Sequence, residues 1–368
     1  MRARRDALAR VLEAAGVGHA VLYGADRSGS AVAWLTGWPV TREAAVVFTP
    51  GERDVLFVQF YNHVPNARLL APDADVRWGG PSTLDRAVEV LLERGARRRR
   101  AGFVGALAYD GGLRLAAALG EPVDLNPAYT RLRMVKSREE IEWLRTGVRL
   151  TDLGVGSLVG GARRGMDEAA LGDLVERGYS GLGGTTHIHY FGIASMEAPD
   201  LCVPAQWPSG RRLSGGDALL CEVSASWWGY AGQALRTFTV GDPTPLYRDL
   251  HAAADAAFDA ICAAIRPGAH ASELVEAASV IEDAGFTIRD DLVHGFVGGY
   301  LPPVLGSKSR KLDDAPDVTL EAGMALVVQP NVVTADEAAG VQTGELVLVG
   351  EGGAERLHSL PRGVLRLD

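Results

Sequence analysis

Two side chains with acid-base chemistry stand beside apolar stretches in the second half of the chain. Glu222 ends one apolar run, and His294 lies between another and the glycine-rich tract 295–299. An imidazole can give or take a proton near neutral pH, and a carboxyl group can share that work, orient the imidazole or bind a cationic group. The glycines would let the backbone approach a ligand closely. With a ligand beside these two acid-base groups, we expect Glu222 and His294 to be catalytic. The alternatives are a histidine held in a hydrogen-bonded core and an ion pair between Glu222 and Arg236.

Two glutamines, Gln233 and Gln329, lie in strand-like stretches that are otherwise apolar. A buried amide that lacks a partner costs roughly 1–3 kcal/mol, so each must find one in the protein or in a ligand. We therefore expect both amides to bind the substrate, together with Tyr230 and Tyr300 as walls of the pocket.

His187 and His189 alternate along a strand-like stretch, which predicts that they share one face. Either could supply a second catalytic histidine, and we favour His189. The alternative is a pair of histidines at the surface or between subunits. The spacing alone is weak evidence for a metal site.

The elements that would position these residues fall into two groups. The stretch 1–132 alternates helical and strand patterns, which is typical of an α/β layer. There we expect strands at 19–23, 44–48, 55–60 and 102–105, and helices around 8–12 and 84–92. After residue 132, Ser137 and Glu140 form a capping box that opens a long helix. Beyond it we expect strands at 190–195, 217–224, 230–240, 324–333 and 345–349, and helices at 171–179, 251–265 and 272–283.

Five segments of the second half resemble, in order and spacing, the pita-bread hydrolase family of creatinase, aminopeptidase P, prolidase and methionine aminopeptidase. They are 221–223, 230–238, 293–296, 328–331 and 340–345, and the phrase from Arg133 to Arg145 that precedes them is also similar. The resemblance implies an α/β (α+β) protein with a creatinase/prolidase N-terminal-like domain, 1–132. A pita-bread catalytic domain, 133–368, would follow, with a curved, largely antiparallel sheet covered by helices. It also implies a homodimer.

The metal-dependent members of that family carry Asp, Asp, His, Glu and Glu at five positions, which fall here on Glu222, Gln233, His294, Gln329 and Gly344. A two-metal site needs several anionic ligands to hold two cations about 3.5–4 Å apart. We therefore expect no metal and no other cofactor, with the glutamines replacing lost carboxylates. Glu345, beside the empty position, is expected to contact the substrate, or to complete a single weak ion site with Glu222 and His294 if it turns inward.

These residues lead to one principal hypothesis. We expect a metal-independent enzyme that acts on a small polar, nitrogen-containing metabolite through His294 and Glu222. The reaction would be C–N hydrolysis, as in creatinase, or an elimination, dehydration or cyclisation in a biosynthetic pathway. The first alternative is a metal-dependent Xaa-Pro aminopeptidase or prolidase-like peptidase. The second is a non-catalytic binding protein on the same fold.

The bulk properties exclude several classes of partner. A net charge of -9 and a pI near 5.5 argue against binding to nucleic acid or to an acidic membrane surface. No apolar run approaches the length of a membrane span. The three cysteines show no paired spacing, so we expect a reduced, cytoplasmic chain. Only Cys202 is a candidate nucleophile. With nucleic acid and membrane excluded, the expected partner is a small-molecule substrate.

Overall fold

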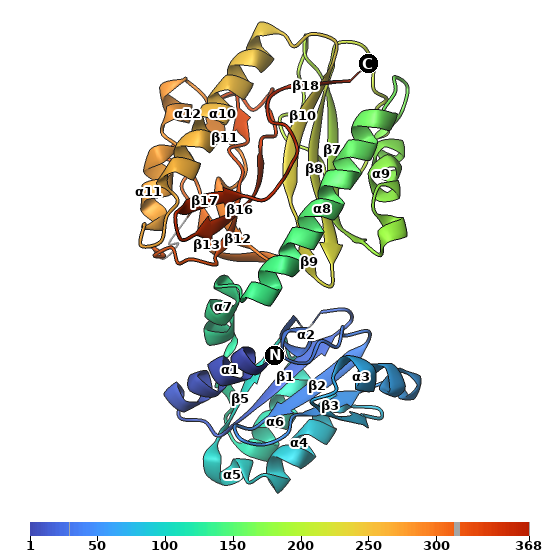
Figure 1. Ribbon diagram of the computed structural model, residues 1–368, viewed down its shortest axis with the longest axis vertical. Helices are drawn as coiled ribbons and strands as arrows, with labels where there is room; N and C mark the ends of the chain where they lie inside the picture. The colour runs from blue at the N-terminus through green and yellow to red at the C-terminus, as the bar shows by residue number, and fades with distance from the viewer. Residues whose placement is uncertain (29, 313–316, 368) are drawn as a thin grey trace. The chain divides into compact units, whose positions relative to one another are not determined.

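The structure is a computed structural model that describes residues 1–28, 30–312 and 317–367, and it divides into two units (Figure 1). The units are Met1–Arg133 and Met134–Asp368. Among the described residues, no helix combines the length and the apolar character needed to cross a bilayer.

The first unit is a six-stranded sheet with helices on both faces. The strand order is β4-β3-β2-β1-β5-β6, with the bounds β1 His19–Ala25, β2 Glu43–Phe48, β3 Val55–Val58, β4 Asp75–Trp78, β5 Ala101–Val104 and β6 Val123–Asp124. Alternate residues of β1 enter different hydrophobic clusters: Ala20 and Leu22 pack with helix α1 (Arg2–Ala14), whereas Val21 packs with α4 (Thr83–Glu93). Both faces of the sheet are therefore buried, and the expected α/β layer is confirmed.

The other helices of this unit are short. They are α2 Ser30–Thr36, η1 Tyr61–His63, α3 Val64–Leu70, α5 Ala96–Arg99, α6 Tyr109–Leu119 and α7 Asn126–Met134. Helix α6 packs with α4 through Leu115.

The second unit is built on a ten-stranded sheet that is largely antiparallel. Its main path is β13-β12-β14-β16-β10-β8-β7; β17 pairs with β16, β9 with β8, and β18 pairs in parallel with β10. The bounds are β7 Thr185–Ser195, β8 Asp217–Trp227, β9 Tyr230–Ala231, β10 Ala234–Val240, β12 Val293–Phe296, β13 Tyr300–Leu305, β14 Ala325–Val328, β16 Gly344–Gly350, β17 Gly353–Arg356 and β18 Leu365–Leu367. A separate pair is formed by β11 Thr287–Ile288 and β15 Val332–Val333.

Two groups of helices cover this sheet, as Figure 1 shows. Helices α8 (Arg138–Gly161) and α9 (Glu168–Arg177) pack on β7 and β8, with η2 (Ser180–Leu182) after α9. Helices α10 Pro245–Ala264, α11 Ala271–Ala277 and α12 Val280–Asp283 pack on β12, β14 and β16. The predicted capping box is present, because the Ser137 side chain accepts from the Glu140 backbone N–H and the Glu140 carboxylate accepts from the Ser137 N–H.

Two strands that were expected to be continuous are interrupted at the glutamines. A Cβ on Gly232 would lie 2.4 Å from the Cα of Val148 in α8, so the chain passes this helix closely and β9 ends before Gln233. Pro330 has no N–H for a ladder bond, and β14 ends at Val328, just before Gln329. Both amides therefore sit at breaks between strands rather than inside them.

Candidate functional site

Glu222 and Gln233 meet on one face of the β8–β10 pair. Glu222 lies opposite Leu235, which in turn lies opposite Gly344 of β16, so these three positions share a face. The Glu222 side chain is 8% exposed, and its Oε1 accepts a hydrogen bond of 2.6 Å from Gln233 Nε2. The alternative of an ion pair between Glu222 and Arg236 is wrong, because Arg236 lies opposite Cys221 and therefore points to the other face.

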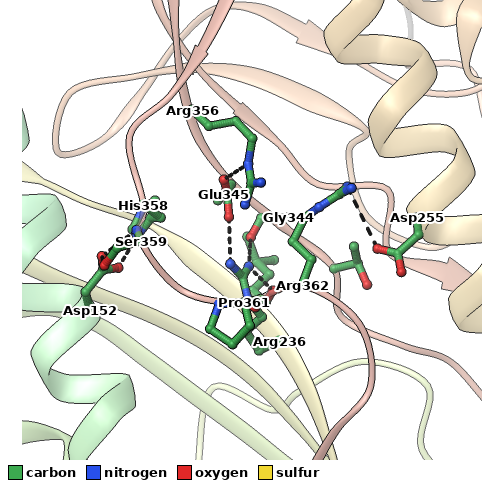
Figure 2. Close-up of polar contacts among 12 residues, drawn as sticks. Asp152, Arg236, Asp255, Gly344, Glu345, Arg356, His358, Ser359, Pro361 and Arg362 are labelled. Carbon is green, nitrogen blue, oxygen red and sulfur yellow. Dashed lines mark hydrogen bonds and ion pairs between the residues drawn. The ribbon is translucent and has the colours of Figure 1, made fainter.

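Glu345 does not turn into this site. It follows Gly344 in β16 and occupies the other face, where it is fully buried. Figure 2 shows its carboxylate between two guanidinium groups, with Arg236 Nη2 at 2.6 Å and Arg356 Nε at 2.6 Å. The expectation that Glu345 contacts the substrate or completes an ion site is therefore not met by the geometry.

His294 lies in β12 and is completely buried. Its Nδ1 lies 3.1 Å from the Gly295 carbonyl oxygen, and its ring stacks on Tyr300 with a centroid separation of 3.9 Å. Burial lowers the pKa of His294 to about 4, so the ring is neutral at neutral pH. Because a carbonyl oxygen can only accept, Nδ1 carries the proton and Nε2 is left as an acceptor.

The tract 295–299 brings backbone close to other backbone of the same chain. A Cβ on Gly295 would lie 2.4 Å from the Pro302 carbonyl oxygen, and one on Gly298 would lie 2.2 Å from that of Gly229. These glycines therefore allow close packing of β12 and the loop that follows it, whereas the sequence pattern had suggested close approach to a ligand.

An aspartate pair that the sequence analysis did not select completes the site. Asp291 Oδ1 accepts from the Tyr300 hydroxyl at 2.9 Å, and Asp291 Oδ2 lies 4.0 Å from His294 Nε2. Gln329 Nε2 donates to the Asp291 backbone oxygen at 3.2 Å. The available signal in the sequence was the pair Asp290-Asp291, which immediately precedes the apolar run before His294.

Among the described residues, no arginine or lysine pairs with Glu222 or Asp291, and the pKa of each of these two carboxyl groups is raised. Burial, with Asp290 nearby, raises the pKa of Glu222 to about 8. Burial and Asp290 also raise the pKa of Asp291. Burial and all three carboxylates raise the pKa of the Tyr300 phenol, which places Glu222, Asp290 and Asp291 within electrostatic range of one hydroxyl.

Several buried polar atoms of the site have no hydrogen-bond partner among the described residues. These atoms are Ser224 Oγ, Gln233 Oε1, Asp291 Oδ2, His294 Nε2 and Gln329 Oε1. Most buried polar atoms in folded proteins are paired, with protein groups or with bound molecules. The site is therefore suited to a small polar ligand.

The histidines of β7 do not share a face. A bulge between Thr186 and Ile188 interrupts the alternation. His187 lies beside Phe296, at 5.9 Å between ring centroids, and Phe296 in turn lies 5.6 Å from His294. His189 points to the helices instead, with its Nε2 3.2 Å from the Tyr179 hydroxyl, and burial lowers its pKa to about 4.

Tyr230 and Cys202 also lie apart from the reactive groups. The Tyr230 hydroxyl donates to Glu140 of α8 at 2.8 Å, and its ring packs against Trp143. The Cys202 thiol is buried, which raises its pKa and disfavours the nucleophilic thiolate. Tyr300 is the expected wall residue that the structure does place against His294.

The residues present do not fit a dinuclear metal centre. Gln233 and Gln329 offer neutral amides, and a Cβ on Gly344 would lie 2.3 Å from the Val328 carbonyl oxygen and 2.7 Å from the Gln329 Cα. In the part of the chain that the structure describes, no group of three or more His, Cys, Asp or Glu side chains is arranged to hold a metal ion. A side chain at 344 would need β14 to move, so the site has closed around the missing ligand.

Both units match known families. Residues 142–351 match the family model described as metallopeptidase family M24, and residues 4–135 match that of the creatinase/prolidase N-terminal domain. An Xaa-Pro dipeptidase of Pyrococcus furiosus is 25% identical over 235 residues, which cover 64% of this chain and 66% of that protein. A probable dipeptidase PepE of Mycobacterium tuberculosis is 28% identical over 263 residues, covering 69% of this chain and 66% of the relative. These alignments span about two thirds of each relative.

Solved structures agree on the fold. An X-Pro aminopeptidase from Thermotoga maritima superposes with a TM-score of 0.83 at 17% identity, covering 97% of this chain and 100% of that one. Dipeptidase PepE from Mycobacterium ulcerans superposes with a TM-score of 0.81 at 23% identity, covering 99% of this chain and 97% of that one. The expected pita-bread architecture behind a creatinase-like N-terminal domain is confirmed.

The expected function, in contrast, is not confirmed. The comparisons overturn a metal-independent, creatinase-like enzyme acting on a nitrogen-containing metabolite, because the relatives are named as Xaa-Pro dipeptidases and dipeptidases. Hydrolysis is supported in general terms, whereas elimination, dehydration and cyclisation are not. The first alternative, a peptidase of the Xaa-Pro type, is the better interpretation.

Proposed function

The chain belongs to metallopeptidase family M24, a family of hydrolases, and we propose that it hydrolyses short peptides of the Xaa-Pro type at the site around Glu222 and His294. The names of the curated relatives support this substrate class. The proposal rests on one observation: strand pairing and hydrogen bonds bring together four buried side chains from separate segments, Glu222, Gln233, His294 and Gln329. Three of them keep an unpaired polar atom. A dipeptide matches such a site, because its polar groups are numerous and closely spaced.

Within this proposal, each side chain contacts the peptide through the atom that the protein leaves unpaired. The neutral His294 ring presents Nε2 as a hydrogen-bond acceptor, and Gln233 and Gln329 present their carbonyl oxygens. The bond from Gln233 fixes the orientation of the Glu222 carboxyl group. His187 packs against Phe296, which also packs against His294, so we assign the role of a second histidine to His187 rather than to His189, which lies beside Tyr179.

A proline-release assay tests the proposal. Glycyl-proline and alanyl-proline are incubated with the purified chain, with and without added manganese, cobalt or zinc, so that the assay does not assume how the reaction is supported. We expect proline release by the wild type and its loss in His294→Ala and Glu222→Gln. Glu351→Gln, an exposed site between β16 and β17, is the matched control and should retain full activity.

Two results would contradict the proposal. The first is no proline release under any of these conditions by a chain that binds the dipeptides, which would favour a binding protein on this fold. The second is unchanged turnover in the folded His294→Ala variant. The expected homodimer stays a prediction, and gel filtration of the same preparation measures it.

A further inference from the structure

We propose that Glu222, Asp291 and the unpaired acceptors around them form a binding site for a protonated primary amine. The inference rests on the proposed function, in which this amine is the free amino group of the peptide. It assigns a role to Asp290, Asp291 and Tyr300, which lie outside the five ligand positions of the pita-bread family.

The first support is that the carboxylates of this site lack a cation. Within residues 1–28, 30–312 and 317–367, Glu222, Asp290 and Asp291 form no ion pair with an arginine or lysine, and the His294 ring lies 4.0 Å from Asp291. Two other buried carboxylates are paired with cations: Glu345 is held by two arginines, and Asp54 by Arg5 at 2.6 Å. Since buried carboxylates are normally paired, a cation is the group that this site lacks.

The second support is that four of the five unpaired buried atoms of the site are hydrogen-bond acceptors, whereas the fifth, Ser224 Oγ, can donate or accept. Gln233 Nε2 is already used on Glu222 and Gln329 Nε2 on the Asp291 carbonyl oxygen, so both amides present their oxygens. The His294 Nδ1–H is used on the Gly295 carbonyl oxygen, which leaves Nε2. Asp291 Oδ1 is taken by Tyr300, and Oδ2 is free. A ligand that fits these four acceptors brings several hydrogen-bond donors.

A primary ammonium group meets both conditions. It carries a positive charge and three N–H donors on one nitrogen, and a hydrogen bond to a charged partner is the strongest kind available in such a site. A divalent metal ion meets them less well, because two amides and a glycine stand at three of the five ligand positions of the family. A carboxylate or phosphate end of a ligand would be repelled by the three acidic side chains.

The site can be reached from solvent at one side. Tyr300, which holds Asp291, is 56% exposed, and Asp290 is also exposed. His294, Gln233 and Gln329 are fully buried behind them. An ammonium group would therefore enter past Tyr300 and Asp290, while the remainder of the peptide extends toward the opening.

Calorimetric titration of two matched ligands tests the inference. Glycyl-proline carries the ammonium group, and N-acetyl-glycyl-proline has the same backbone without it. We expect the acetylated peptide to bind about ten- to a hundredfold more weakly to the wild type, as the loss of charge-assisted hydrogen bonds would produce. In Asp291→Asn that ratio should fall toward one, because the unacetylated peptide alone loses affinity. Asp283→Asn, an exposed aspartate of α12, is the control and should keep the wild-type ratio.

Other outcomes would overturn the inference. They are equal affinity of the two peptides for the wild type, no binding of either at millimolar concentration, or an unchanged ratio in Asp291→Asn. Thermal stabilisation by manganese or zinc that disappears in Asp291→Asn would replace the ammonium ion by a metal. If Asp291→Asn does not fold, as judged by circular dichroism, Tyr300→Phe removes only the hydroxyl that orients Asp291 and should reduce the same ratio.

The failure of this inference and that of the proposed function are distinguishable. Tight binding of glycyl-proline without proline release would contradict the peptidase and leave the ammonium site intact. Proline release from the acetylated and free peptides at the same rate would support a peptidase and remove the ammonium site.

Discussion

Replacing Glu345 by glutamine should destabilise the second unit by about 3 kcal/mol. The carboxylate is fully buried and accepts from Arg236 Nη2 and Arg356 Nε, each at 2.6 Å. Removing one partner of a buried ion pair costs roughly 3–5 kcal/mol, because the other charge stays buried without compensation. We take the lower end for two reasons. Arg356 is 42% exposed and can turn to water, and Arg236 keeps its bonds to the carbonyl oxygens of Leu235, Gly344 and Pro361.

The assay is urea unfolding followed by circular dichroism, with wild type and variant measured side by side. The matched control is Glu355→Gln, which removes a carboxylate that also pairs with an arginine, Arg145 at 2.9 Å, on the surface. An exposed pair of this kind contributes about 0–1 kcal/mol. A cost of Glu345→Gln no greater than that of Glu355→Gln would show that burial does not strengthen this ion pair.

The pH dependence gives a second check on Glu345. Its two arginines hold the pKa of this carboxyl group below its usual value, even though burial acts in the opposite direction. A carboxyl whose pKa is lower in the folded state contributes stability above its unfolded pKa of about 4.5, and that contribution is lost as the pH falls through the folded pKa. The difference between wild type and Glu345→Gln should therefore shrink as the solution is acidified below that range.

Three further predictions concern the site and its support. Gly344→Ala should cost about 1–3 kcal/mol in urea unfolding, since its Cβ would press on Val328 and Gln329, whereas Gly352→Ala, at a turn with open space, should cost much less. Ser137→Ala should cost about 1 kcal/mol in the same measurement, because the long helix α8 loses its N-terminal cap. Removal of divalent metal with EDTA should leave the melting temperature unchanged within error, because amides and a glycine stand at three of the five ligand positions; a fall would reveal an ion that these residues help to hold.

Local patterns predicted much of the fold. The strands β1 and β2 follow from runs of β-branched and aromatic residues, and the start of α8 follows from the capping box of Ser137 and Glu140. Such signals succeed because they depend on neighbours within a few residues. The break at Gln233 was missed because it depends on a distant element, helix α8, which passes close to Gly232. The break at Gln329 was missed because it depends on the missing N–H of Pro330, which ends the ladder of β14.

The site was harder to predict for the same reason. Glu222 and His294 were selected by their resemblance to known ligand positions, whereas Asp291 matches no such position. Its importance arises from the β12–β13 pairing, which brings Tyr300 over His294 and within reach of Asp291. A β-bulge between Thr186 and Ile188 likewise places His187 and His189 on different faces of the sheet. The sequence pattern of a strand does not show where such a bulge occurs.

The segment after β17 has a consequence for how the second unit comes apart. His358 Nδ1 lies 2.6 Å from Asp152 of α8, and Arg362 Nη2 lies 2.6 Å from Asp259 of α10 (Figure 2 shows His358 and Arg362 in this segment). Helix α8 belongs to one hydrophobic cluster of the unit and α10 to another. One stretch of chain thus contacts a helix of each core. Slow amide exchange in α8 and in α10 should consequently report a single cooperative opening.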